Sequence, residues 1–248
     1  MHRLLLAFLL LPAPTLASGV ALEYEVRYGL LQVLAMQTTA RFDAGRYEAT
    51  SRMQTVGLAG VLFPWTARAS TDGVRDGGDL RPSRHRSHGA YRGSERSVSL
   101  DYDPAGAVRA AVVPPPEADY REPVPDGERT STIDPLTATL TALQSGCRGT
   151  LRIFDGRRRY DLTLTDLGES ELPEATPVYG GPARHCRAGV TPHAGFWRTT
   201  DRQDERPAQL DVWIAAPRAD VQPVPVYMQL SGQRGALDFQ LSAATPLP

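Results

Sequence analysis

The feature that most constrains this chain is a two-residue alternation of apolar and polar side chains, which recurs in at least eight segments. Residues 22–28 alternate leucine, tyrosine and valine with charged residues, and residues 210–214 and 226–230 show a similar alternation. This period is typical of a β-strand with one apolar face and one polar face. A sheet made of such strands must bury its apolar face against something.

One segment carries the signals of a helix instead. Asp134 is a good N-cap, because its carboxylate can accept hydrogen bonds from the free N–H groups of the first turn. Pro135 follows at the position where a missing N–H costs nothing. The helix is expected to run to about Gln144, where Ser145 and Gly146 end it. We expect this to be the only substantial helix.

These patterns predict an all-β fold with one short helix. A single short helix cannot cover so many one-sided strands, so the antiparallel sheet should curve strongly and close into a barrel or half-barrel. Two stacked sheets are the alternative. We count about eleven or twelve strands, and more than about eight leave space inside a barrel. The helix, together with residues 56–65, is expected to fill the mouth.

The N-terminus has the pattern of a secretory signal peptide over residues 1–17, with cleavage as late as residue 21 as an alternative. Its apolar run is too short to span a bilayer, and no other apolar stretch is long enough to be a membrane helix. The mature chain is expected to be a periplasmic, single β domain over residues 22–244. Residues 114–129 are rich in proline and are expected to form an extended surface connection, although a linker between two domains would show the same composition.

Two cysteines, Cys147 and Cys186, are present. In an exported protein, an even number of cysteines indicates a disulfide. The bond would stabilise the fold by about 4 kcal/mol through the entropy of the unfolded chain. A redox-active or nucleophilic cysteine, or a metal site that includes the neighbouring His185, is the less favoured alternative.

Motifs of known enzymes are missing from the sequence, which has no G-x-S-x-G, H-E-x-x-H, Walker loop or dinucleotide fingerprint. His85 and His88 should lie on opposite faces of a strand, which is unfavourable for a shared metal. We therefore assign no catalytic residue, metal or cofactor, and an enzymatic activity stays open. The formal net charge of -1 does not favour nucleic acid as a partner.

The apolar segment 56–65 interrupts the alternation with two glycines and a proline. Such a segment beside an internal space could contact an apolar ligand. The candidate ligand-binding residues are Leu58, Val61, Leu62, Phe63 and Trp65. A core plug is the alternative. A second candidate site is the strand face with Arg84 and Arg86, which could bind an anion, or could simply be solvated.

Several motifs follow one another along the chain: L-E-Y-E-V-R-Y-G, I-D-P-L-T-A-T-L, I-F-D-G-R-R-R-Y-D-L, A-Q-L-D-V-W-I-A and V-P-V-Y-M-Q-L. With the two cysteines, they resemble the exported bacterial family catalogued as domain of unknown function 3108. The resemblance covers nearly all of the mature chain, and D-G-R-R-R-Y is its most specific motif. The arginine-rich middle does not match. The resemblance implies an envelope protein of Gram-negative type and supplies no catalytic residues.

The function most consistent with these observations is non-enzymatic binding of a lipophilic or amphipathic envelope molecule on the concave face of the sheet. Proteins that carry lipoproteins also use a curved sheet with an apolar concave side, which is an analogy of fold only. The first alternative is a structural or interaction protein of the envelope with a filled core and a surface partner site. An outer-membrane barrel is a second alternative, which the low aromatic content of 7% and the capped helix disfavour.

Overall fold

The computed structural model describes residues 19–43, 45–115, 121–198, 209–232 and 235–248. Within this part of the chain, thirteen strands form one antiparallel sheet. The strands are β1 (Gly19–Tyr28), β2 (Leu31–Asp43), β3 (Arg46–Thr55), β4 (Trp65–Asp76), β5 (Asp79–Tyr91), β6 (Ser94–Tyr102), β7 (Val108–Val113), β8 (Gly149–Phe154), β9 (Arg159–Glu171), β10 (Pro182–Ala194), β11 (Gln209–Ala215), β12 (Val224–Gly232) and β13 (Gly235–Leu247). The helices are α1 (Gly57–Leu62), α2 (Asp126–Arg129) and α3 (Pro135–Gln144).

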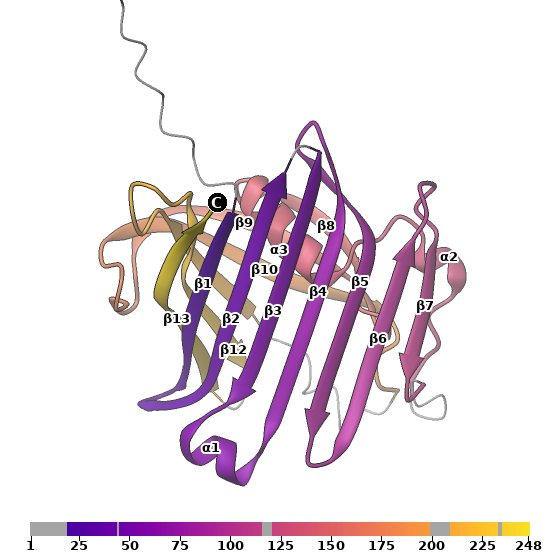
Figure 1. Ribbon diagram of the computed structural model, residues 1–248, viewed down its shortest axis with the longest axis horizontal. Coiled ribbons are helices and arrows are strands. Elements are labelled where there is room, and N and C mark those ends of the chain that lie inside the picture. Colours follow the sequence, from indigo (N-terminus) through magenta and orange to yellow (C-terminus); the bar gives the residue numbers. More distant parts are fainter. Residues whose placement is uncertain (1–18, 44, 116–120, 199–208, 233–234) are drawn as a thin grey trace, which may run out of the picture.

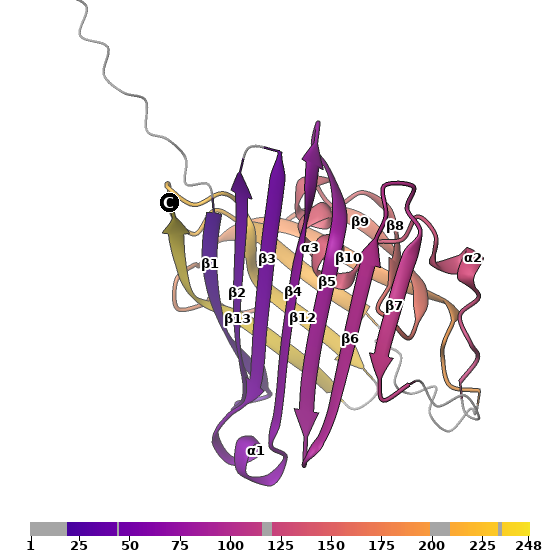
Figure 2. The ribbon, with the colours of Figure 1, turned by 45° about the vertical axis from the view of Figure 1, so that its right-hand side comes forward.

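The strand order is β7-β6-β5-β4-β3-β2-β1-β13-β12-β11-β10-β9-β8, so the first and last strands pair in the middle of the sheet. The sheet curves strongly until its two arms face each other, with β1–β7 nearer the viewer in Figure 1 and β8–β12 behind. The 45° turn in Figure 2 shows the same two layers. β7 and β8 are the two edges and do not pair with each other. The predicted fold class, an all-β half-barrel, is confirmed.

Some strands are longer than predicted. The glycine and aspartate content of residues 72–76 favours a turn, but these residues continue β4 and pair with β3 and β5. Residues 168–182 contain several glycines and prolines, which favour a loop, but residues 168–171 continue β9, and residues 169–171 pair with β10. In both cases a long neighbouring strand offers a complete set of backbone partners, which outweighs a weak local preference for turns.

The proline-rich connection also differs from its prediction. Residues 116–120 lie outside the described part of the chain, and the connection ends in the single helical turn α2 after Pro125. The sequence also predicts a short strand around residues 196–200. Its described part, residues 196–198, contains only an isolated bridge between Trp197 and Arg121, whose guanidinium carbon lies 4.0 Å from the centre of the indole ring. The predicted signal peptide lies outside the described residues.

Helix α3 has the boundaries that its sequence predicts. The Asp134 side chain accepts hydrogen bonds from the backbone N–H groups of Leu136 and Thr137, each at 3.0 Å, and Pro135 occupies the first turn. The helix lies inside the curve of the sheet, between the two layers (Figure 1). It buries Thr137, Ala138 and Leu140, and Leu140 packs with Tyr47 and other buried residues of the near layer.

The gap between the two edges of the sheet is bridged by the turn between β8 and β9. Asp155 accepts hydrogen bonds from the backbone N–H groups of Arg157 and Arg158, which holds the predicted D-G turn in place. Gly156 has a φ of +91° and lies against the side chain of Val98 on β6, so a Cβ atom has no room there. Arg157 donates a hydrogen bond to the carbonyl oxygen of Pro114, just after β7, at 2.9 Å. The motif D-G-R-R-R therefore connects the two arms of the half-barrel.

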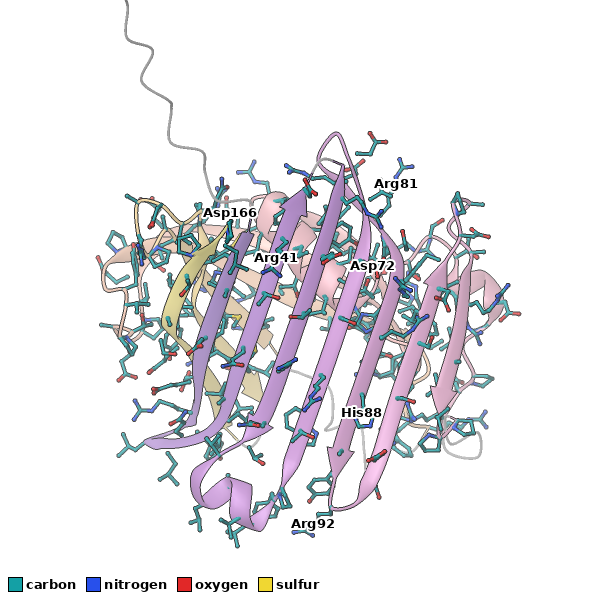
Figure 3. All side chains as sticks on the ribbon, viewed as in Figure 1. Arg41, Asp72, Arg81, His88, Arg92 and Asp166 are labelled. Atoms are coloured by element: carbon teal, nitrogen blue, oxygen red, sulfur yellow. A yellow bond between two sulfur atoms is a disulfide. The ribbon has the colours of Figure 1, made fainter. Side chains whose placement is uncertain are left out.

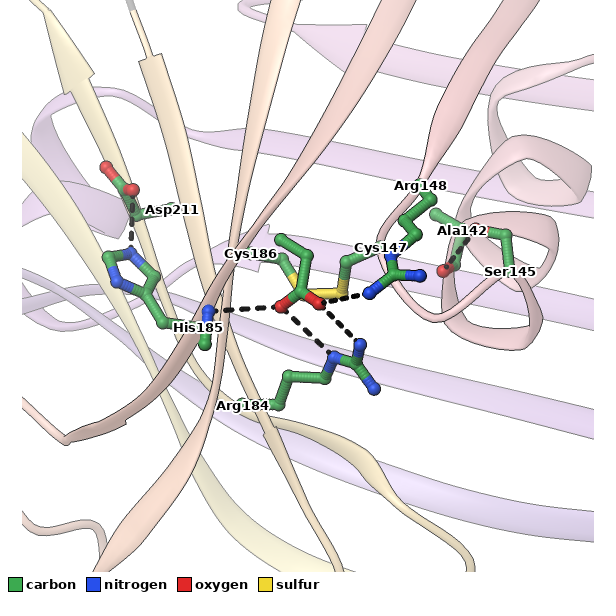
Figure 4. Close-up of a disulfide and its surroundings, with 10 residues drawn as sticks. Ala142, Ser145, Cys147, Arg148, Arg184, His185, Cys186 and Asp211 are labelled. Atoms are coloured by element: carbon green, nitrogen blue, oxygen red, sulfur yellow. Dashed lines mark hydrogen bonds and ion pairs between the residues drawn. A yellow bond between two sulfur atoms is a disulfide. The ribbon is translucent and has the colours of Figure 1, made fainter.

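The predicted disulfide between Cys147 and Cys186 is present, with a Cα–Cα distance of 5.6 Å and both residues buried (Figure 4). Cys147 follows the C-terminal end of α3, and Cys186 lies in β10 of the far layer. On the surface beside the disulfide, the carboxylate of Asp166 pairs with Arg184 at 2.5 Å and Arg148 at 3.3 Å. The disulfide therefore attaches one end of the internal helix to the far layer.

Candidate functional site

A buried polar cluster surrounds the N-terminal end of α3. One carboxylate oxygen of Asp134 lies 3.0 Å from His85 Nδ1. The other oxygen accepts hydrogen bonds from the hydroxyl groups of Thr71 at 3.0 Å and Thr137 at 2.5 Å. The hydroxyl of Tyr47 lies 2.8 Å from that of Thr137. The helix cap is therefore connected to β3, β4 and β5 of the near layer.

The cluster has catalytic residue types but no access for a substrate. Asp134 and Thr137 have no exposed surface, and His85 is 4% exposed. Burial alone would raise the pKa of Asp134, but the hydrogen bonds from His85 and Thr137 and the charge of His85 outweigh it and lower the pKa. Burial also raises the pKa of the Tyr47 phenol. We conclude that these side chains position α3, and that Asp134 is ionised at neutral pH.

The stability of the protein should fall in acid, and Asp134 should contribute to the fall. Because folding lowers the pKa of Asp134, its contribution is present above the unfolded pKa of about 4 and is lost as the pH falls through the folded pKa. Urea unfolding at several pH values should show a shallower loss of stability in acid for Asp134→Asn, which cannot ionise, than for the wild type. The pKa values of Asp161, Asp166 and Asp211 are also lowered, but these residues contribute equally in both proteins. An equal dependence of the unfolding free energy on pH in the two proteins would therefore contradict this expectation.

His85 and His88 lie on opposite faces of β5, as the sequence predicts, with His85 buried and His88 exposed. On the outer face, Arg84 pairs with Asp72 at 3.1 Å, and Arg86 pairs with Asp101 at 2.7 Å and donates to the carbonyl oxygen of Leu100. Both guanidinium groups are partly exposed. An anion bound there would compete with these carboxylates, and anion binding by Arg84 and Arg86 stays a prediction.

The predicted ligand-binding segment forms α1 and the start of β4, at the end of the sheet away from α3 (Figure 1). Four of its apolar side chains are exposed: Leu58 by 69%, Val61 by 78%, and Leu62 and Phe63 by 52% each. None of the six residues of α1 is buried. The alternative interpretation as a core plug is therefore wrong, and α1 does not fill the barrel as α3 does.

Other exposed apolar side chains lie at the same end of the sheet. We define the apolar rim as eight side chains from α1 and the residue after it, the turn between β1 and β2 and the end of β5: Tyr28, Leu30, Leu31, Leu58, Val61, Leu62, Phe63 and Tyr91. The other exposed large apolar side chains of the described residues are Val74, Val113 and Leu167. Most such exposure is thus gathered at one end of the molecule, which is typical of an interaction surface.

Hydrogen bonds, strand pairing and one arginine–aromatic contact hold the rim together although its side chains are exposed. Val56, before α1, donates to the carbonyl oxygen of Val33 on β2 at 3.0 Å. Arg92 lies in the turn between β5 and β6, at the same end of the sheet as α1 (Figure 3). It donates to the carbonyl oxygen of Leu62 at 3.1 Å and lies over the ring of Phe63. Trp65 pairs with Tyr91 across β4 and β5. The three segments therefore form one connected surface.

The concave face near this end is apolar and only half-buried. Register partners place Met53, Met36 and the buried Tyr24 side by side on this face. A second row crosses the middle of the sheet, also with register partners adjacent, and consists of Val212, Met228, Phe239, Val26 and Leu34. Of these residues, Met36, Met53, Val212, Met228, Phe239 and Leu34 keep part of their surface exposed. Trp65 is half-buried on the same face as the buried Thr71, at the entrance of this region.

No helix in the described part of the chain is long and apolar enough to cross a bilayer. A search of curated proteins finds no match. Among solved structures, the chain is similar to a β-barrel-like protein of domain of unknown function DUF1849 from Brucella abortus. The two chains are 11% identical, with a TM-score of 0.53, and the alignment covers 94% of this chain and 99% of the other. At this identity the similarity concerns the fold alone.

The model of one protein family matches residues 23–241, which is most of the chain. Its description is protein of unknown function, DUF3108. The match includes the capped helix, both cysteines and the turn that bridges the two arms of the sheet. The chain therefore belongs to the DUF3108 family of proteins of unknown function.

Proposed function

We propose that this protein binds a lipophilic or amphipathic molecule of the cell envelope on the concave face of its sheet, without catalysing a reaction. The observation that supports the proposal best is the half-buried apolar surface formed by Met36, Met53, Met228 and Phe239. Apolar side chains on a concave surface bind an acyl or ring system by removing it from water. The flexible methionine side chain adapts to ligands of different shape, so this surface should bind a class of apolar molecules and not one exact shape.

The entrance would be formed by Leu58, Val61, Leu62, Phe63 and Trp65. Trp65 lies on the concave face, whereas α1 lies at the end of the sheet (Figure 1), where its exposed side chains would extend the apolar surface. The proposal places the protein in the periplasm, which is supported by the pattern of a signal peptide and by the disulfide.

The test is the binding of a fluorescent long-chain fatty acid to the purified mature protein, followed by fluorescence titration. We expect saturable binding, and a loss of affinity of about tenfold or more in Met53→Gln/Met228→Gln, because each buried amide lacks a hydrogen-bond partner against an acyl chain. Arg52→Gln, on the opposite face of β3, is the matched control and should bind like the wild type.

Native mass spectrometry of protein prepared from a periplasmic extract gives an independent test. An additional mass that is lost on extraction with organic solvent would support the proposal. Absence of both a bound molecule and saturable binding would contradict it and favour the alternative of a structural or interaction protein with a filled core.

A further inference from the structure

We propose that the apolar rim docks on a lipid bilayer that contains anionic headgroups, and that this end of the protein is where a ligand enters or leaves the concave face. The nature of the ligand rests on the proposed function, but the docking surface is supported by separate observations. They concern the shape of the rim, its residue types and the charges beside it.

The shape of the rim suits a bilayer better than a folded partner. Its residues lie in a short helix and in turns at the end of the sheet (Figure 1), and their side chains are 43–91% exposed, so they protrude into solvent. Protruding apolar tips insert about 5–10 Å into the interfacial region of a bilayer without requiring a complementary surface. The exposed aliphatic side chains Leu30, Leu58 and Val61 would enter the acyl region, where the hydrophobic effect favours them.

The aromatic residues of the rim match this position. Tyr28, Phe63 and Tyr91 are about half exposed. Tyrosine is enriched at the boundary between lipid headgroups and acyl chains, because its ring is apolar and its hydroxyl group is polar. The Tyr91 ring also contacts the guanidinium of Arg92, with 5.4 Å between the guanidinium carbon and the ring centre.

Two arginines beside the rim favour anionic headgroups. Arg27 donates to the carbonyl oxygen of Leu30 at 3.2 Å, and Arg92 donates to that of Leu62 at 3.1 Å. Among the described residues, neither guanidinium forms an ion pair with a carboxylate, in contrast to Arg84, Arg86 and many other arginines of this chain. Their positive charges are thus available to lipid phosphates, which arginine binds well.

The experiment is co-sedimentation of the mature protein with vesicles of phosphatidylcholine, with or without about a quarter of phosphatidylglycerol. We expect binding to the mixed vesicles and affinity about tenfold lower for pure phosphatidylcholine. The variant Leu58→Ser/Val61→Ser should also lose about tenfold, and it should fold normally because neither side chain is buried. Val74→Ser/Leu167→Ser, which changes exposed apolar residues outside the rim, is the matched control and should bind like the wild type.

The proposal is overturned if the wild type does not bind mixed vesicles, or if both double variants bind equally well. It is also overturned if the rim instead buries itself in a dimer, which Leu58→Ser/Val61→Ser would convert into a monomer in sedimentation equilibrium. Met53→Gln/Met228→Gln separates docking from the proposed function, because it should keep vesicle binding while losing the fatty acid. Vesicle binding without any fatty-acid binding would support docking and contradict the proposed function. Fatty-acid binding without vesicle binding would support the proposed function and contradict docking.

Discussion

Replacing Asp134 by alanine should lower the free energy of unfolding by about 3–5 kcal/mol, because it removes the helix cap and leaves buried polar groups without their hydrogen-bond acceptor. The change removes the cap of α3, which alone contributes about 1 kcal/mol. It also leaves the hydroxyl group of Thr71 and the imidazole of His85 buried beside an empty space. Urea unfolding at neutral pH, monitored by circular dichroism, measures the loss.

The matched control is Asp101→Ala. Asp101 pairs with Arg86, but both side chains are partly exposed. Because water screens an exposed pair, we expect this change to cost no more than about 1 kcal/mol. If Asp134→Ala were as mild as Asp101→Ala, the buried cluster would not position the helix and our interpretation of it would fail.

This cluster shows where sequence analysis succeeds and where it stops. The boundaries of the helix were predictable because their signals are local. Asp134 and Pro135 mark its start, and Gly146 stands just after its end. The partnership of Asp134 with His85 was missed, because it depends on which strands the helix packs against. The two-residue alternation of a strand predicted that His85 and His88 lie on opposite faces of the sheet. Nothing in the sequence connects His85 with Asp134, the N-cap of the helix.

The candidate site was predictable to a similar extent. Residues 56–65 break the alternation, which indicated a special role, but the burial of Leu58 and Val61 could not be decided from their composition. The neighbouring parts of the rim, at Leu30 and Tyr91, are single apolar residues in turns and carry no signal of their own. They form one surface with α1 only because the meander of hairpins brings alternate turns to the same end of the sheet.

The open edge of the sheet explains why the internal helix matters so much. A closed barrel would hold its two arms together by backbone hydrogen bonds, but β7 and β8 do not pair. Helix α3 connects the arms instead, together with the turn between β8 and β9. Asp134 attaches its N-terminal end to strands of the near layer, and Cys147 attaches the residues after its C-terminal end to β10 of the far layer. The cap and the disulfide therefore act on the same element from opposite ends.

Removing the disulfide with Cys147→Ala/Cys186→Ala should consequently lower the free energy of unfolding by about 4 kcal/mol, as expected for a bond between residues 39 positions apart. Alanine is preferable to serine, since both positions are buried and a hydroxyl group would lack a partner. The dependence of the free energy on urea concentration should become steeper, because the unfolded chain without the crosslink exposes more surface. An unchanged slope and midpoint would show that the bond contributes nothing.

The two largest changes should not be additive. If the cap and the disulfide both stabilise the protein by holding α3 between the layers, then a protein that has lost one attachment has less to lose from the other. We expect the loss in the triple variant Asp134→Ala/Cys147→Ala/Cys186→Ala to be smaller than the sum of the separate losses by about 1 kcal/mol or more. Simple additivity within about 0.5 kcal/mol would mean that the two sites stabilise separate parts of the sheet, and that the helix does not connect the arms.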